Sequence, residues 1–265
     1  MSGEYVELPG VKTWYETEGQ GDPLVLMHGG LVGNDFWGAQ REVLAADFQL
    51  FLPERRAHGH TPDVEGPLSY YDMAKDTIDF LTTVVGKPAH LVGWSDGGNV
   101  SLLVAIERPD LVRKVVVVGA NYLPSSEIAG LDALPDSLDP DSPDLAMFRG
   151  FYEAASPDGP GHWPDYIAKM KQMWSTEPRI STDDLGRITA RALVAVGDDD
   201  MIPVEHAAEM YRSITNSELA VIPGTSHAAL MEKPELVNKV VLDFLKNEPV
   251  PTIMPIRRAP ADAPH

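Results

Sequence analysis

The fold of this chain is decided by the five residues GWSDG at positions 93–97. A short apolar run at 89–92 precedes them, and a helical pattern begins near Gly98. Ser95 is therefore predicted to lie on a sharp turn between a strand and a helix, where the flanking glycines permit a strained backbone. The strain lifts the serine hydroxyl out of the sheet, so that a substrate carbonyl can reach it. The pattern is specific only with a strand before it, a helix after it, and an acid and a histidine later in the chain.

The residue after the serine contributes in a different way. The turn places the backbone amide of Asp96 at a helix N-terminus, where it can donate a hydrogen bond to a developing oxyanion. We interpret the Asp96 side chain as a helix-start residue, whose negative charge suits the helix dipole. Ser95 is thus the candidate nucleophile, and the Asp96 amide is a candidate oxyanion-hole donor.

The composition is that of an ordinary soluble globular protein. Of the 265 residues, 43% are hydrophobic and 23% are charged, enough for one α/β domain with a sizeable core. Cysteine is absent, which excludes disulfides, thiolate catalysis and thiolate metal sites. No apolar run approaches the length of a membrane span, and the first residues show no secretory pattern. We therefore expect a cytoplasmic location.

The charge of the chain argues against several classes of partner. There are 21 Lys and Arg residues against 40 Asp and Glu residues, a formal net charge of -19. Such a surface repels phosphate backbones and anionic membranes, so neither nucleic acid nor a membrane is expected as a partner. The acidic surface mainly serves solubility, and a preference for neutral or cationic substrates is the second interpretation. We expect a small-molecule substrate, and the sequence is compatible with a homodimer.

Strand and helix signals alternate along most of the chain. This alternation predicts an α/β fold with a mostly parallel central sheet and helices on both faces. Pro9-Gly10 separates two opening strand segments into a hairpin, and the helical stretch 70–85 is amphipathic. Further strands are predicted at 24–27, 49–53, 89–92, 112–118, 192–196 and 219–222, and further helices at 34–46, 99–107, 204–214 and 234–246.

The alternation breaks between residues 124 and 189. This stretch holds eight prolines and scattered apolar helical pieces, and it is too long for a plain loop. We interpret it as a helical cap inserted between two central strands, with an aromatic and methionine stripe that serves mainly for packing. The predicted organisation is a core of residues 1–123 and 190–246, a cap of residues 124–189, and a proline-rich tail of residues 247–265 that is extended or disordered.

A serine nucleophile needs a base, and the base needs an acid that fixes its tautomer. A strand at 194–197 ends in three consecutive acids, Asp198, Asp199 and Asp200, and the loop after the last strand carries His227. The chain order serine, acid, histidine therefore has a candidate at every step. The competing interpretation is that the three acids merely end a strand and cap the following helix.

With these residues together, the chain resembles the α/β-hydrolase fold superfamily, specifically its capped single-domain serine hydrolases. The resemblance covers about residues 4–246. It implies that the acid lies three residues past the glycine that ends its strand, at Asp200. Asp199 is the first alternative, and Asp198 is the second.

The same resemblance assigns two further stretches. The loop HGG at 28–30 follows an early strand, and the family pattern implies that the amide of Gly30 joins that of Asp96 in an oxyanion hole, with Leu31 as the alternative donor. Residues 54–61 stand in the place of a D-x-R-G-x-G-x-S stretch, with a glutamate for the aspartate and an alanine for the first glycine. We expect residues 54–61 to form a scaffold turn outside the reacting centre.

Five residues are predicted to line the substrate pocket around Ser95. His58 and His60 are spaced as in some metal sites, but no further ligands cluster with them, so no metal ion is expected. No cofactor is expected either. The candidate lining residues are Leu31, Trp94, Tyr122, Phe151 and Trp174.

These inferences predict a metal-free serine hydrolase. The expected substrate is a carboxylic ester or lactone of a medium-sized, partly apolar molecule, cleaved through an acyl-enzyme on Ser95. One alternative is a C–C bond hydrolase of β-diketone-like compounds, or a perhydrolase, on the same three residues. A second alternative is a small-molecule receptor with little turnover.

Overall fold

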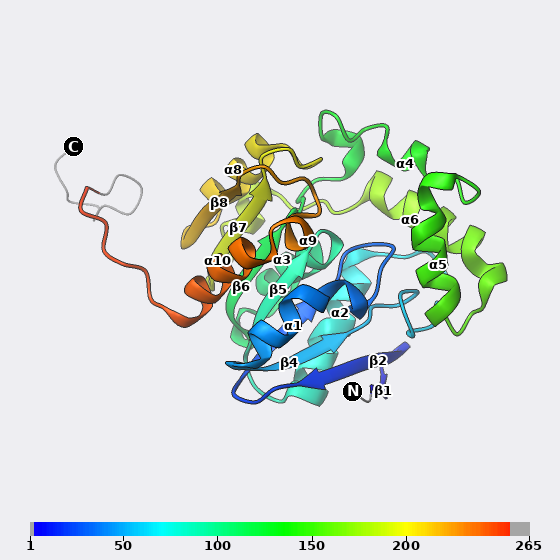
Figure 1. Cartoon of the computed structure of the whole chain (residues 1–265), viewed down its shortest axis with the longest axis horizontal. Helices are drawn as coiled ribbons and strands as arrows, with labels where there is room; N and C mark the ends of the chain where they lie inside the picture. The colour runs from blue at the N-terminus through cyan, green and yellow to red at the C-terminus, as the bar shows by residue number, and fades with distance from the viewer. Residues whose placement is uncertain (1–2, 255–265) are drawn as a thin grey trace.

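A single eight-stranded sheet organises the molecule (Figure 1). The structure is a computed structural model that describes residues 3–254. The strand order is β1-β2-β4-β3-β5-β6-β7-β8, in which the β1–β2 and β2–β4 pairs are antiparallel and the other pairs are parallel. The strands are β1 (Glu4–Leu8), β2 (Val11–Glu18), β3 (Asp22–Met27), β4 (Phe48–Pro53), β5 (Ala89–Trp94), β6 (Val112–Val118), β7 (Arg191–Gly197) and β8 (Ser217–Ile222).

Helices cover both faces of this sheet, as the alternation predicts. In β6, Val115 and Val117 belong to the core under one set of helices, whereas Val116 and Val118 belong to the core under the other set. A parallel strand buried on both faces is apolar at every position, which explains the unbroken run of valines. One face carries α1 (Gly38–Ala45), α9 (Ala229–Glu232) and α10 (Pro234–Lys246), and the other carries α2 (Tyr70–Phe80), α3 (Asp96–Glu107) and α8 (Val204–Ser213).

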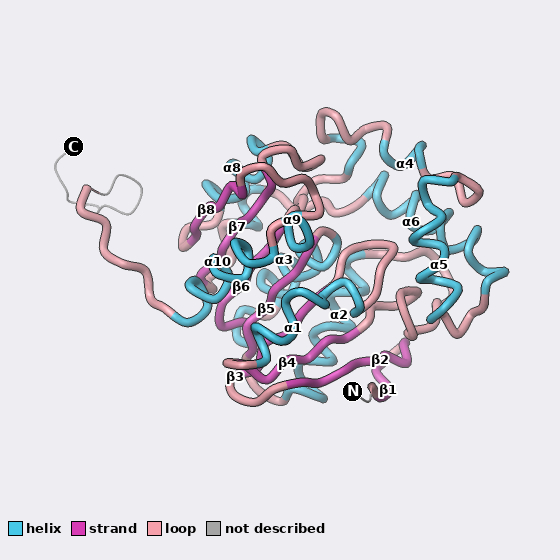
Figure 2. The backbone as a smooth tube through the Cα atoms, in the orientation of Figure 1, coloured by secondary structure: helices cyan, strands magenta, loops and turns pink. Residues whose placement is uncertain are grey.

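The chain between β6 and β7 forms helices and loops without a strand (Figure 2). Its aromatic and methionine stripe is buried: Trp163, Tyr166, Met170 and Met173 are each at most 1% exposed. These side chains join the core on the α3 side of the sheet, so the stripe packs the segment onto the body of the molecule. The helices of the segment are α4 (Leu134–Ser137), α5 (Ala146–Ala155), α6 (Trp163–Thr176) and α7 (Thr182–Leu185).

Three helices differ from the prediction by more than one residue. The helix predicted at 34–46 is α-helical only as α1, after a 3-10 turn at Asn34–Trp37. The helix after the serine turn begins at Asp96, because the Gly98 N–H already donates to the Ser95 carbonyl oxygen at 2.7 Å. The predicted helix at 70–85 is α-helical only as far as Phe80, and a wider π-helical turn, Leu81–Val85, follows it. Gly86, with φ of +69°, ends that turn in a left-handed conformation that glycine adopts without strain.

The C-terminal segment leaves the body of the molecule after α10 (Figure 1). Residues 247–254 contain neither helix nor strand, and the rest of the predicted proline-rich tail lies outside the described residues. Within residues 3–254, no helix has both the length and the apolar character needed to cross a membrane.

Candidate active site

The turn between β5 and α3 has a strained backbone at Ser95. This residue has φ of +53°, in the left-handed region that side chains other than glycine rarely adopt. Its N–H donates to the Val118 carbonyl oxygen at 2.8 Å, and its own carbonyl oxygen accepts from the first turn of α3. A Cβ at Gly97 would overlap the carbonyl oxygen of Met27, and one at Gly93 would overlap that of Gly97. Both glycines of the motif are therefore required by the close approach of backbone.

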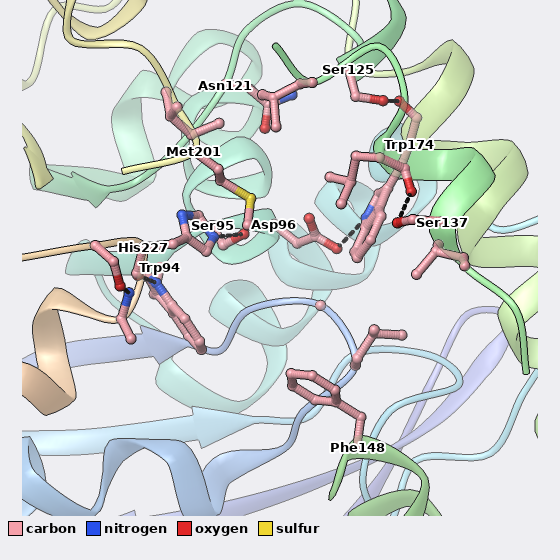
Figure 3. Close-up of a pocket in the computed structure, with 18 of the residues that line it drawn as sticks. Trp94, Ser95, Asp96, Asn121, Ser125, Ser137, Phe148, Trp174, Met201 and His227 are labelled. Atoms are coloured by element: carbon pink, nitrogen blue, oxygen red, sulfur yellow. Dashed lines mark hydrogen bonds between the residues drawn. The ribbon is translucent and has the colours of Figure 1, made fainter. Parts of the chain in front are cut away.

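Ser95 lies at one end of a chain of three hydrogen-bonded side chains, of which Figure 3 shows Ser95 and His227. Its Oγ is 2.9 Å from Nε2 of His227, and Nδ1 of the same ring is 2.8 Å from Oδ1 of Asp200. The Asp200 carboxylate, whose side chain is 1% exposed, accepts the Nδ1 proton. The Nε2 lone pair is then free to accept the proton of the Ser95 hydroxyl.

Only one of the three consecutive acids after β7 reaches the histidine. Asp198 accepts a hydrogen bond from the backbone N–H of Thr225 at 3.1 Å, so it supports the loop that carries His227. Asp199 is exposed, and its backbone N–H donates to the Thr225 carbonyl oxygen. The geometry therefore selects Asp200 among the three candidates of the sequence.

The two candidate oxyanion donors lie close to each other across the site. A Cβ at Gly30 would come within 2.5 Å of Oδ2 of Asp96 and 2.7 Å of the Trp174 ring, so the backbone at Gly30 lies directly against these side chains. Gly30, Ser95 and Asp96 all line the same cavity. The amide of Asp96 is the first of α3, where no acceptor exists within the helix.

The Asp96 side chain is held by residues outside its own helix. Its carboxylate accepts a hydrogen bond from the Tyr70 hydroxyl at 2.6 Å. It also accepts one from the Trp174 indole N–H at 3.0 Å (Figure 3). Asp96 is 4% exposed, and this burial raises the pKa of its carboxyl group. The sequence indicated a helix-start residue only, because nothing local to position 96 identifies Tyr70 and Trp174 as its partners.

A cavity of about 390 Å³ opens in front of the serine. The segment between β6 and β7 supplies about half of its apolar wall and also four polar residues, Asn121, Ser125, Ser137 and Glu177. The loops at the ends of the strands supply Ser95, Asp96, Ser226 and His227. Asp96 and Glu177 are the carboxyl side chains of the lining, and no Lys or Arg of the described residues belongs to it. The apolar wall from the segment includes Leu131, Leu134, Leu138, Leu145, Met147 and Phe148.

Three of the five predicted pocket residues line this cavity, namely Leu31, Trp94 and Trp174. The Trp94 indole N–H also donates to the His227 carbonyl oxygen at 2.9 Å, so this ring helps to hold the histidine loop.

Tyr122 and Phe151 do not line the main cavity. The Tyr122 ring stacks on His206 at 4.1 Å and donates its hydroxyl proton to Glu209, so it faces α8. Phe151 is 40% exposed and borders a separate small cavity beside Phe36. The sequence predicted both residues near the site, but it contains no local signal for whether a side chain between β6 and β7 faces the cavity or another element.

His58 and His60 have partners other than a metal ion. His58 is buried and contacts the Arg56 carbonyl oxygen through Nδ1, and His60 pairs with Glu54 at 3.0 Å. Across the described part of the chain, no group of three or more His, Asp or Glu side chains could hold a metal.

Residues 24–240 match the Alpha/beta hydrolase family, which is most of the chain. The chain belongs to the alpha/beta hydrolase family. The human serine hydrolase BPHL is 28% identical to this alpha/beta hydrolase, over 91% of this chain and 85% of the relative. A 2-hydroxy-6-oxo-6-phenylhexa-2,4-dienoate hydrolase of Burkholderia cepacia is 27% identical, over 86% of this chain and 89% of its own.

Solved structures of other proteins have the same fold as this chain. A thermophilic esterase from Thermogutta terrifontis superposes with a TM-score of 0.71 at 25% identity, covering 93% of this chain and 98% of the esterase. These relatives of the alpha/beta hydrolase differ in the reaction for which they are named. The likeness therefore establishes the family and the fold, and the substrate must be argued from the site itself.

Proposed function

We propose that this chain is a serine hydrolase that cleaves a carboxylic ester or lactone of a medium-sized, partly apolar molecule. The observation that carries the proposal is the contact of Ser95 Oγ with His227 and of His227 with Asp200, at 2.9 and 2.8 Å, at the floor of an apolar cavity. A half-buried serine with a strained backbone, beside a histidine and a buried acid, is typical of an activated nucleophile.

In the proposed reaction, Ser95 Oγ attacks the substrate carbonyl carbon while His227 Nε2 takes the hydroxyl proton. The resulting oxyanion accepts hydrogen bonds from the amides of Gly30 and Asp96, and the loss of one such donor commonly costs about 3 kcal/mol of transition-state stabilisation. The protonated His227, stabilised by Asp200, returns the proton to the leaving alkoxide as the C–O bond breaks. Water then attacks the acyl-enzyme, with His227 again as the base, and releases the acid and free Ser95.

The charges around the cavity support a neutral or cationic substrate. Asp96 and Glu177 lie in the lining, and no Lys or Arg of the described residues offsets them there. A substrate carboxylate in this cavity would be desolvated without a lining cation to pair with it. An anionic substrate is therefore disfavoured.

The same observation bears on the C–C bond hydrolase alternative. The relative from Burkholderia cepacia is named for a dienoate, which is a carboxylate anion. This cavity offers no Lys or Arg among its lining residues to pair with such a group. The charges of the lining therefore favour an ester or lactone over an anionic C–C bond substrate.

Hydrolysis of p-nitrophenyl esters of increasing acyl length tests the proposal. We expect wild type to turn over these esters and Ser95→Ala to lose that turnover, whereas Ser213→Ala, on the exposed face of α8, retains it. A parallel set of neutral, cationic and anionic acyl groups should show the anionic members to be the poorest substrates. Equal turnover by wild type and Ser95→Ala, or hydrolysis of the dienoate alone, would overturn the proposal.

A further inference from the structure

Arg55 is a buried cation that interacts electrostatically with Asp96 but forms no direct ion pair. It follows β4, is 5% exposed, and forms no ion pair within residues 3–254. Its Nε also has no hydrogen-bond partner among these residues. A buried charge that is not directly ion-paired is costly unless hydrogen bonds compensate it, so the partners of the Arg55 guanidinium matter. The expectation that residues 54–61 are only a scaffold turn does not account for this buried charge.

The guanidinium of Arg55 is bonded to the loop that carries the candidate oxyanion donor. It donates to the carbonyl oxygens of His28 and Gly29, the second at 2.9 Å from Nη2. The Gly29 carbonyl oxygen also lies 2.8 Å from Nδ1 of His28. The backbone N–H of Arg55 donates to Nε2 of the same ring, which leaves the ring proton on Nδ1 for Gly29. Two donors therefore fix one carbonyl group.

The direction of that carbonyl determines the direction of the next amide. In a trans peptide the C=O and the following N–H point to opposite sides of the chain, and Glu177–Pro178 is the cis peptide of the described residues. Because the Gly29 C=O points at Arg55, the Gly30 N–H points away from Arg55. Gly30 lines the cavity with Ser95, so this N–H faces the side on which the oxyanion forms.

The loop is also confined from its other side. The backbone at Gly30 lies against the Asp96 carboxylate and the Trp174 ring, so that the loop is enclosed between a buried cation and a buried anion. The charge of Arg55 in turn opposes the effect of burial on the pKa of the Asp96 carboxyl group. A hydrogen bond from a cation to a carbonyl polarises the peptide, which makes its N–H a stronger donor.

We propose that Arg55 is a positioning residue for the oxyanion hole: it orients and polarises the Gly29–Gly30 peptide so that the Gly30 N–H stabilises the tetrahedral intermediate on Ser95. This inference rests on the proposed hydrolase function. Arg55 touches neither the substrate nor Ser95, and it acts through the loop. The inference also selects Gly30 over Leu31 as the donor.

The test compares an oxygen ester with the matching thionoester in wild type, Arg55→Met and Arg55→Lys. Sulfur is a weak hydrogen-bond acceptor, so only the oxygen ester benefits from a well-oriented oxyanion donor. We expect Arg55→Met to lower kcat for the oxygen ester by about 10- to 100-fold with little change in KM, and to lower thionoester turnover far less. Arg55→Lys, which donates to one carbonyl at a time, should recover part of the loss.

Arg56→Met is the matched control, because Arg56 adjoins Arg55 but pairs with Asp76 at 2.7 Å and faces away from the loop. This variant should lose stability and keep the ester-to-thionoester ratio of wild type. If the Arg55 variants lose turnover of the oxygen ester and of the thionoester by the same factor, so that the ratio of the two turnovers is that of wild type, the inference is overturned. Arg55→Lys preserves the buried charge, so the ratio is measured in a folded protein even where Arg55→Met does not fold. Failure of wild type to hydrolyse any ester would instead overturn the proposed function.

Discussion

The turn at Ser95 and the segment between β6 and β7 both border the cavity, but they are held by different kinds of interaction. The turn is fixed by backbone hydrogen bonds, by glycines that no other residue can replace, and by buried polar groups. The segment contributes short helices whose apolar side chains form the cavity wall. We infer that the reaction chemistry resides in the first region, where geometry is strictly constrained, and that substrate choice resides in the second.

The largest expected effect lies in the first region. Asp200→Asn should lower kcat by about 10⁴-fold, because an amide in this position leaves His227 in the wrong tautomer to accept the serine proton. Steady-state kinetics with a p-nitrophenyl ester measures the loss. Asp199→Asn is the matched control, since the exposed Asp199 side chain does not reach His227, and it should stay within about twofold of wild type. Similar losses in both variants would contradict the assignment of the acid.

The buried side chain of His58 predicts that the folded protein loses stability in acid. Burial, with the nearby charge of Arg55, lowers the pKa of His58 from 6.5 to about 3. Between these pH values the unfolded chain binds a proton that the folded protein excludes, so the folded state loses stability as the pH falls from 6.5 toward 3. At pH 5 the loss from this residue is about 2 kcal/mol.

The variant His58→Phe keeps an aromatic ring beside Tyr166. In wild type the centres of the His58 and Tyr166 rings are 5.3 Å apart, in an edge-to-face arrangement. Urea titrations at pH 7 and pH 5 measure the free energy of unfolding in each protein. We expect the decrease between the two pH values to be about 2 kcal/mol smaller in His58→Phe than in wild type. The same decrease in both proteins would show that His58 is not held neutral in the folded state.

The smallest effect is expected in the second region. Phe148 on α5 reaches the cavity (Figure 3), whereas Phe151, one turn further along the same helix, does not. Phe148→Ala should raise KM for long-chain esters about tenfold and leave short-chain esters and kcat nearly unchanged, because only the long chains contact this ring. Phe151→Ala should leave KM unchanged at every chain length. A fall in kcat as large as that in Asp200→Asn would remove the distinction between the two regions.

The sequence predicted the first region far better than the second, for a physical reason. The turn is encoded locally: a strand, two glycines around Ser95 and a helix leave few alternatives for the backbone. Asp200 and His227 follow strand ends that parallel pairing brings to one edge of the sheet.

The direction of side chains in the inserted segment depends on packing between distant residues, and no local pattern records it. For this reason the sequence did not indicate that Tyr122 stacks on His206 or that Phe151 lines a second cavity. The contacts of Arg55 with the 28–30 loop were likewise invisible, because they join residues 26 or more positions apart. The sequence thus predicted the fold and the proximity of Ser95, His227 and Asp200, whereas it did not predict the walls and supports of the cavity.

The central claim is that Ser95 is the nucleophile of a functioning site. Its most direct test is the mass of wild type and of Ser95→Ala after incubation with a fluorophosphonate, which forms a stable covalent bond to an activated serine. If Ser95 is the nucleophile, we expect one adduct on the wild-type chain, mapped by peptide mass to Ser95, and no adduct on Ser95→Ala. An adduct of equal yield on both proteins, or none on wild type that is folded by circular dichroism, would contradict this claim.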